Sequence, residues 1–147
     1  MDKIDEYEGE HMQRVAACGC GEISITVIGP PVFSAICACT NCQKRTGSAF
    51  GMSAYYDRDK VLKTEGQPTV FRYTSNKDRF LDFRFCPTCG STVWWEVEFM
   101  PDKIGVAGIL FDDDQPFTAD GAYFCATKPD WVSFDESIKM GQAGSTS

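Results

Sequence analysis

Three cysteines within six residues, Cys37, Cys39 and Cys42, are the strongest chemical signal in this chain of 147 residues. Thiolate sulfur is a soft ligand that suits zinc, and closely spaced cysteines are a common way to assemble such a site. Catalytic zinc sites use three protein ligands and leave the fourth position open to water or substrate. The spacing therefore predicts an open three-cysteine zinc site, where a substrate thiol would bind as a nucleophilic thiolate.

Two further cysteine pairs flank this triplet in the sequence. Cys18 and Cys20 precede it, and Cys86 and Cys89 follow it in a turn that ends in Gly90. The two pairs together supply the four sulfur ligands of a closed structural site, which would tie distant parts of the chain together. We therefore predict two zinc sites, one structural with four cysteines and one catalytic with three.

The remaining cysteine, Cys125, and the single histidine, His11, leave another interpretation of the triplet open. Either side chain could supply a fourth ligand and make the triplet a second closed structural site. His11 lies in a polar segment that we expect to be exposed, and Cys125 is better explained as a small buried hydrophobic residue. An open site is therefore the favoured interpretation.

Two basic residues, Lys44 and Arg45, directly follow the triplet. Residues 40–45 are expected to form one helical turn, capped by Thr40 or Asn41. Such a turn would bring its backbone N–H groups and the two cations near the metal, which would favour an anionic ligand there. The alternative is that both cations are solvated surface charges.

The elements that must position these cysteines are short strands. Residues 22–27 alternate between apolar and polar side chains, and residues 32–36 form a second strand that ends at the triplet. Further along, aromatic and β-branched runs are separated by Asp, Gly, Pro and Asn. These predicted strands are 50–56, 61–63, 69–73, 80–85, 92–98, 103–110 and 122–126. The predicted fold class is mainly β with one short helical turn.

Length and composition predict one domain with its own core, since 43% of the residues are hydrophobic. We expect residues 1–14 to form a polar N-terminal lead-in, residues 15–135 the zinc-binding β domain, and residues 136–147 a flexible C-terminal tail. Trp131 is expected to anchor that tail. Four aromatic residues could line the catalytic site, although core positions suit them better: Phe50, Tyr55, Trp94 and Trp95.

The net charge of −7 argues against a nucleic-acid partner, because phosphate binding needs clustered Lys and Arg. No apolar run approaches the roughly 18 residues that a membrane span requires. The polar, acidic start of the chain does not resemble a secretory signal. We therefore expect a cytoplasmic protein, in which the cysteines are metal ligands or reactive thiols rather than disulfides.

The order of these motifs resembles the glutathione-dependent formaldehyde-activating enzyme family, which includes centromere protein V. The similarity spans roughly residues 15–135 and rests on four stretches: Cys18-Gly19-Cys20-Gly21, residues 37–48, residues 85–90 and residues 124–131. One departure is that many members carry a histidine where this chain has Ala122-Tyr123.

The resemblance implies a β-tent-like zinc fold of small antiparallel sheets packed around the four-cysteine site. It also implies a carbon–sulfur lyase type of activity, in which glutathione and formaldehyde are joined as S-hydroxymethylglutathione. The cysteine triplet would hold the second zinc, and Lys44 or Arg45 would meet a glutathione carboxylate. Glutathione or another small thiol, and a small aldehyde, would then be the partners.

Two other classes of function stay open at the level of sequence. The first is a noncatalytic structural zinc module that binds another protein. The second is a redox enzyme that uses Cys125, because type B methionine sulfoxide reductases have a similar zinc-bearing β architecture with a catalytic cysteine late in the chain. The stretch around Cys125 lacks the preceding Arg and following Asn expected for that chemistry.

Overall fold

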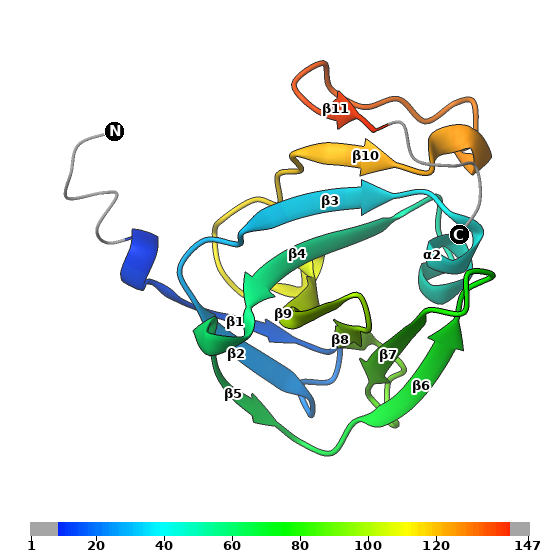
Figure 1. The fold of residues 1–147 in the computed structure, drawn as a ribbon. Helices are drawn as coiled ribbons and strands as arrows, with labels where there is room; N and C mark the ends of the chain where they lie inside the picture. The colour runs from blue at the N-terminus through cyan, green and yellow to red at the C-terminus, as the bar shows by residue number, and fades with distance from the viewer. Residues whose placement is uncertain (1–8, 142–147) are drawn as a thin grey trace.

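Two β-sheets and the short helix α2 (Thr40–Thr46) dominate residues 9–141, the part of the chain that the computed structural model describes (Figure 1). The smaller sheet has the order β1-β2-β5 and contains β1 (Gln13–Ala17), β2 (Ser24–Ile28) and β5 (Val61–Glu65). The larger sheet contains β3 (Phe33–Cys37), β4 (Gly51–Asp57), β6 (Thr69–Thr74), β7 (Phe80–Phe85), β8 (Thr92–Val97), β9 (Met100–Ala107), β10 (Gly121–Tyr123) and β11 (Lys139–Met140). Its strand order is β11-β10-β3-β4-β9-β8-β7-β6. The prediction of a mainly β fold with one short helical turn is confirmed.

Three short 3-10 helices among the described residues interrupt the strand pattern: η1 (Arg58–Lys60), η2 (Gly108–Leu110) and η3 (Cys125–Thr127). The strand predicted at 103–110 is therefore wrong at its end, because β9 stops at Ala107. The strand predicted at 122–126 also extends too far, because β10 stops at Tyr123. There the backbone of Phe124 adopts a left-handed conformation with φ of 55°, which an extended strand does not tolerate.

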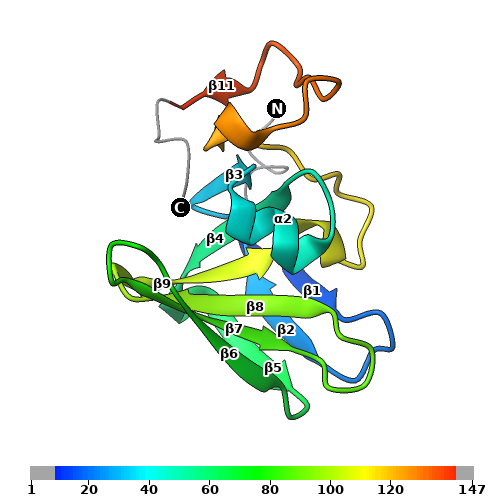
Figure 2. The same ribbon diagram turned by 90° about the vertical axis from the view of Figure 1, so that its right-hand side faces the viewer.

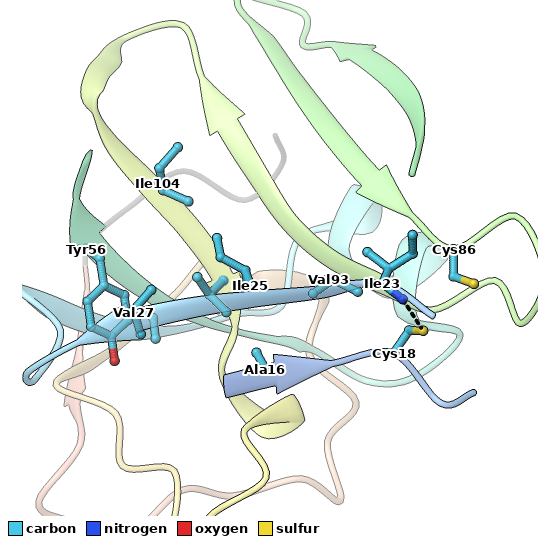
Figure 3. Close-up of a cluster of buried hydrophobic side chains, with 11 residues drawn as sticks. Ala16, Cys18, Ile23, Ile25, Val27, Tyr56, Cys86, Val93 and Ile104 are labelled. Atoms are coloured by element: carbon cyan, nitrogen blue, oxygen red, sulfur yellow. Dashed lines mark hydrogen bonds between the residues drawn. The ribbon is translucent and has the colours of Figure 1, made fainter. Parts of the chain in front are cut away.

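The main hydrophobic core lies between the two sheets. The small sheet contributes Ile25 and Val27, and the large sheet contributes Tyr56 and Val106, all of them fully buried. Burying each such side chain stabilises the fold by about 1.5–3 kcal/mol. Figure 3 shows that this cluster ends at the sulfur atoms of two cysteines, Cys18 and Cys86, next to Ile23.

The other face of the large sheet carries a second cluster, on which α2 lies (Figure 2). Strand register places Tyr55, Gly105, Trp95 and Phe83 side by side across β4, β9, β8 and β7. Gly105 is needed in this row, because a methyl group there would overlap the indole ring of Trp95. The row forms the aromatic floor beneath α2.

Both ends of the described chain contribute strands that the sequence did not indicate. β1 lies partly within the predicted lead-in, and β11 lies within the predicted tail, where it pairs in parallel with β10. The expectation that Trp131 anchors the tail is wrong, because its side chain is 82% exposed and the pairing of β11 holds the segment instead. Residues 1–8 and 142–147 of these two predicted segments lie outside the described residues.

Helices long and apolar enough to cross a membrane are not found in residues 9–141.

Candidate metal centres

Four cysteines from two distant turns meet at one end of the main core. The sulfur atoms of Cys18, Cys20, Cys86 and Cys89 all lie within 4.8 Å of one another. Sγ of Cys20 is 3.7 Å from Sγ of Cys18 and 3.6 Å from Sγ of Cys86. The donor set matches that of a tetrahedral structural zinc site in number and type.

Backbone N–H groups in both turns donate hydrogen bonds to these sulfurs. Ile23 donates to Sγ of Cys18 at 3.2 Å, and Thr88 and Cys89 both donate to Sγ of Cys86 at 3.4 Å. Such hydrogen bonds orient the two sulfurs as ligands. Cys18 and Cys86 are buried, whereas Cys20 and Cys89 are exposed, so the cluster faces solvent on one side.

Ser91 and Glu22 support this cluster, although no sequence motif had indicated them. The N–H of Gly19 donates to Oγ of Ser91 at 3.2 Å, which links the two cysteine turns. The side-chain hydroxyl and backbone N–H of Ser91 lower the pKa of Cys89 to about 5. The hydroxyl of Thr88 donates to Glu22 at 2.7 Å and joins the same turns a second time.

The cysteine triplet forms a separate cluster at the start of α2, and its sulfur atoms also lie within 4.8 Å of one another. Cys37 ends β3, and Cys39 is the N-cap of α2. Sγ of Cys39 accepts a hydrogen bond from the backbone N–H of Cys42 at 3.3 Å. The prediction that Thr40 or Asn41 caps the helix is therefore wrong, because the sulfur of Cys39 accepts the hydrogen bond expected of their side-chain oxygens.

No histidine, carboxylate or further cysteine among residues 9–141 joins the triplet. Cys125 lies in η3 and His11 is exposed near the start of the described chain. The described residues thus offer three ligand atoms at this cluster. Contacts with the sulfurs of Cys39 and Cys42, and burial, raise the pKa of Cys37 above the usual value of a thiol.

Side-chain hydrogen bonds fix the backbone that carries the triplet. Nε2 of Gln43 donates to the carbonyl oxygen of Thr127 at 2.8 Å. The hydroxyl of Thr127 donates to the carbonyl oxygen of Ala38 at 2.5 Å. The N–H of Ala38 donates in turn to the carbonyl of Tyr123 at 3.0 Å. The segment from β10 to η3 therefore positions the cysteine-bearing loop.

The two basic residues that follow the triplet have different surroundings. Lys44 is exposed, whereas Arg45 packs onto the aromatic floor of the large sheet. The guanidinium carbon of Arg45 lies 4.7 Å from the ring centroid of Trp95 and 5.2 Å from that of Phe83. The alternative of a purely solvated surface charge therefore fits Lys44 and does not fit Arg45.

A pocket of about 440 Å³ lies beside the C-terminal end of α2 and is bordered by Arg45 and Phe50. Of the other aromatic residues expected near the site, Tyr55 and Trp95 belong to the floor under α2, and Trp94 packs against the main core. A larger cavity of about 1220 Å³ lies near the N-terminal segment and is bordered by none of the clustered cysteines.

The mainly β fold gathers one four-cysteine and one three-cysteine cluster, and each of them could hold a metal ion through thiolates. The sequence profile of the glutathione-dependent formaldehyde-activating enzyme family matches residues 13–127. The chain therefore belongs to this family, and the resemblance inferred from the motifs is confirmed.

The fold is also found among solved structures. A crystal structure of a Rhodobacter sphaeroides protein, a structural genomics target, has a TM-score of 0.54 and 19% sequence identity to this chain. The similarity covers 69% of this chain and 91% of that protein, and at this identity it shows the fold alone. A comparison with curated proteins finds no match.

Proposed function

We propose that the protein is a zinc-dependent enzyme that joins glutathione to formaldehyde as S-hydroxymethylglutathione. The observation that carries this proposal is the three-cysteine cluster, which no further ligand among residues 9–141 completes, in a chain of the formaldehyde-activating family. A cluster with one position left for an external sulfur suits a reaction in which a thiol is the nucleophile.

The donor chemistry of both clusters fits zinc. Cys18, Cys20, Cys86 and Cys89 would hold a structural ion, and Cys37, Cys39 and Cys42 would hold the ion at the reaction site. Zinc bound by the triplet would supply a Lewis acid that keeps a substrate thiol in its thiolate form near neutral pH.

The reaction itself makes small demands on the protein. The thiol gives up its proton, its sulfur attacks the aldehyde carbon, and the carbonyl oxygen takes up a proton, so the thiol adds across the C=O bond. Because thiols add to formaldehyde unaided, the chain contributes mainly by binding and orienting the thiol. Lys44 or Arg45 would bind a glutathione carboxylate, and only Arg45 is held in a fixed position by packing.

The test is the rate of adduct formation from glutathione and ¹³C-labelled formaldehyde, measured by exchange NMR with zinc-loaded protein. The wild-type chain and a Cys125→Ser variant should both raise this rate above the protein-free value, and a Cys39→Ser variant should not. Equal rates with and without wild-type protein would contradict the proposal. Loss of activity in Cys125→Ser with retained zinc would instead support a role for that thiol.

A further inference from the structure

The guanidinium group of Arg45 packs against aromatic rings, and no carboxylate pairs with it among the described residues. No hydrogen bond or ion pair within residues 9–141 involves this side chain, and its Nε atom is buried without an acceptor. Stacking on Trp95 and Phe83 compensates only in part for the lost hydration of the cation. The arrangement therefore costs stability, which an anion bound at this position would offset.

The glycines around Arg45 make room for its guanidinium group to stack on Trp95. A methyl group at Gly51 would lie 2.5 Å from Nη2 of Arg45, and a methyl group at Gly105 would overlap the indole of Trp95. Nε1 of Trp95 donates to the hydroxyl of Tyr55 at 3.5 Å, which fixes the plane of the ring. Arg45 thus lies on a rigid platform rather than on a mobile surface.

The guanidinium group is also close to the cysteine triplet. The same methyl position at Gly51 is 3.6 Å from Sγ of Cys42, so the cation and this sulfur flank one glycine. Cys42 and Arg45 are three residues apart in α2 and therefore project from the same side of the helix. A small molecule with its sulfur at the triplet would therefore lie near this cation.

A pocket that Arg45 borders lies beside α2. Its walls are partly apolar, from Phe50, Met52 and Ile109, and partly polar, from Ser48 and Ser91. Its volume of about 440 Å³ falls in the usual range for small-molecule sites, about 300–1,000 Å³.

Arg45 supplies the positive charge at the border of this pocket. Among the described residues that border it, Arg45 is the only one with a basic group, and none has a carboxylate. Lys44 does not border the pocket, and Cys89 of the four-cysteine cluster does. The pocket therefore borders the four-cysteine cluster at Cys89, and Arg45 is the group in it that could bind an anionic ligand.

We propose that Arg45 is the specificity-determining residue of the thiol site, and that it selects thiols that carry a carboxylate over neutral thiols. This inference rests on the proposed function. The thiol sulfur lies at the triplet, and the carboxylate accepts hydrogen bonds from the terminal nitrogens of Arg45 in the pocket, where a planar guanidinium can bind it through two of them.

The experiment compares two ligands that share one sulfur: glutathione, and its diethyl ester, in which both carboxylates are masked. Binding to zinc-loaded protein is measured by titration calorimetry for the wild-type chain and for Arg45→Met, with Lys44→Met as the matched control. The wild-type chain and Lys44→Met should bind glutathione about 10- to 100-fold more tightly than the ester, a range typical of a charge-assisted hydrogen bond. Arg45→Met should lose this preference while its affinity for the ester stays unchanged.

A second variant keeps the positive charge of Arg45 and moves its guanidinium group. Gly51→Ala should displace the guanidinium of Arg45 and reduce the preference for glutathione, whereas zinc content and circular dichroism should match the wild-type chain. This variant decides the question if Arg45→Met does not fold.

The outcomes separate the inference from the proposed function. Equal affinities of the wild-type chain for acid and ester would overturn the role of Arg45 and leave the thiol site standing. An equal loss of the preference for glutathione over the ester in Lys44→Met and Arg45→Met would also overturn the role of Arg45. If neither ligand binds the wild-type chain, the proposed function fails, and the inference fails with it.

Discussion

Sγ of Cys20 lies 3.6 Å from Sγ of Cys86, although 66 residues separate these two cysteines. The contact joins the turn after β1 to the turn after β7, and so connects the small sheet to the large one. Cys18 and Cys86 are also members of the main core cluster. A metal ion bound there would therefore stabilise the junction on which the packing of both sheets depends.

Substitution Cys86→Ser should accordingly unfold the domain. Structural zinc contributes about 10–16 kcal/mol in small zinc-binding peptides, which is comparable to the whole stability of a typical domain, about 5–15 kcal/mol. Thermal unfolding followed by circular dichroism, together with zinc content, checks this. Cys125→Ser, outside both clusters, is the control and should melt within a few degrees of wild type. A cooperative transition of Cys86→Ser at the wild-type temperature would refute the structural role.

Substitution Cys39→Ser should have a different result, namely the loss of about one equivalent of zinc from a chain that stays folded. Cys39 is the N-cap of α2, and serine is among the best N-cap residues, so the hydrogen bond to the N–H of Cys42 is retained. Elemental analysis and a thermal melt measure the two quantities. Global unfolding would show that the triplet, too, is a structural site.

The aromatic floor under α2 predicts a cost for Gly105→Ala. The added methyl group meets the indole ring of Trp95, which is 1% exposed and has no room to move. Overpacking of this kind destabilises by about 1–3 kcal/mol. Urea unfolding of Gly105→Ala should show this loss. Gly9→Ala is the control, since no described atom outside its own segment lies within 4 Å of its added methyl group. Equal midpoints for the two variants would contradict the description of the floor.

The pair formed by Arg14 and Asp113 predicts a pH dependence of stability. Nε and Nη2 of Arg14 donate to the carboxylate at 2.7 and 3.2 Å, and these hydrogen bonds hold the pKa of Asp113 below its usual range. Because the folded pKa lies below the unfolded value of about 3.9, the contribution is fully present above that value. It is lost as the pH falls through the lowered folded pKa.

Asp113→Asn should therefore destabilise the domain by about 1 kcal/mol near neutral pH, as expected for a partly exposed ion pair. Denaturant unfolding at several pH values measures the difference from wild type. That difference should stay constant from about pH 7 to pH 5 and shrink below about pH 4. A difference that grows in acid would have the wrong sign for this pair.

The local parts of the site could be predicted from the sequence. Cysteine spacing alone indicated both clusters, because residues two or three apart in a turn or at a helix start lie close in space. The strand 80–85 was equally clear, since its apolar residues alternate and turn residues flank it. Its buried residue, Phe83, lies on the strand face that also carries Leu81 and Phe85.

The nonlocal parts could not be predicted. Whether Lys44 or Arg45 packs inward depends on how α2 is rotated over β8 and β9, and therefore on Trp95 and Gly105, which no motif connects to the helix. β1 was missed for a related reason: its pairing with β2 defines it more clearly than its own residue pattern does.

The central claim is that the cysteine triplet is an open metal centre that binds a thiol sulfur. The most direct test is the visible absorption spectrum of cobalt-substituted protein before and after addition of glutathione, because cobalt in thiolate sites reports its coordination. We expect two cobalt sites, a saturable spectral change in about half of the bound metal, and no change in Cys39→Ser. A spectrum of two closed sites that glutathione does not alter would show that the triplet does not bind a thiol and would indicate a noncatalytic zinc module.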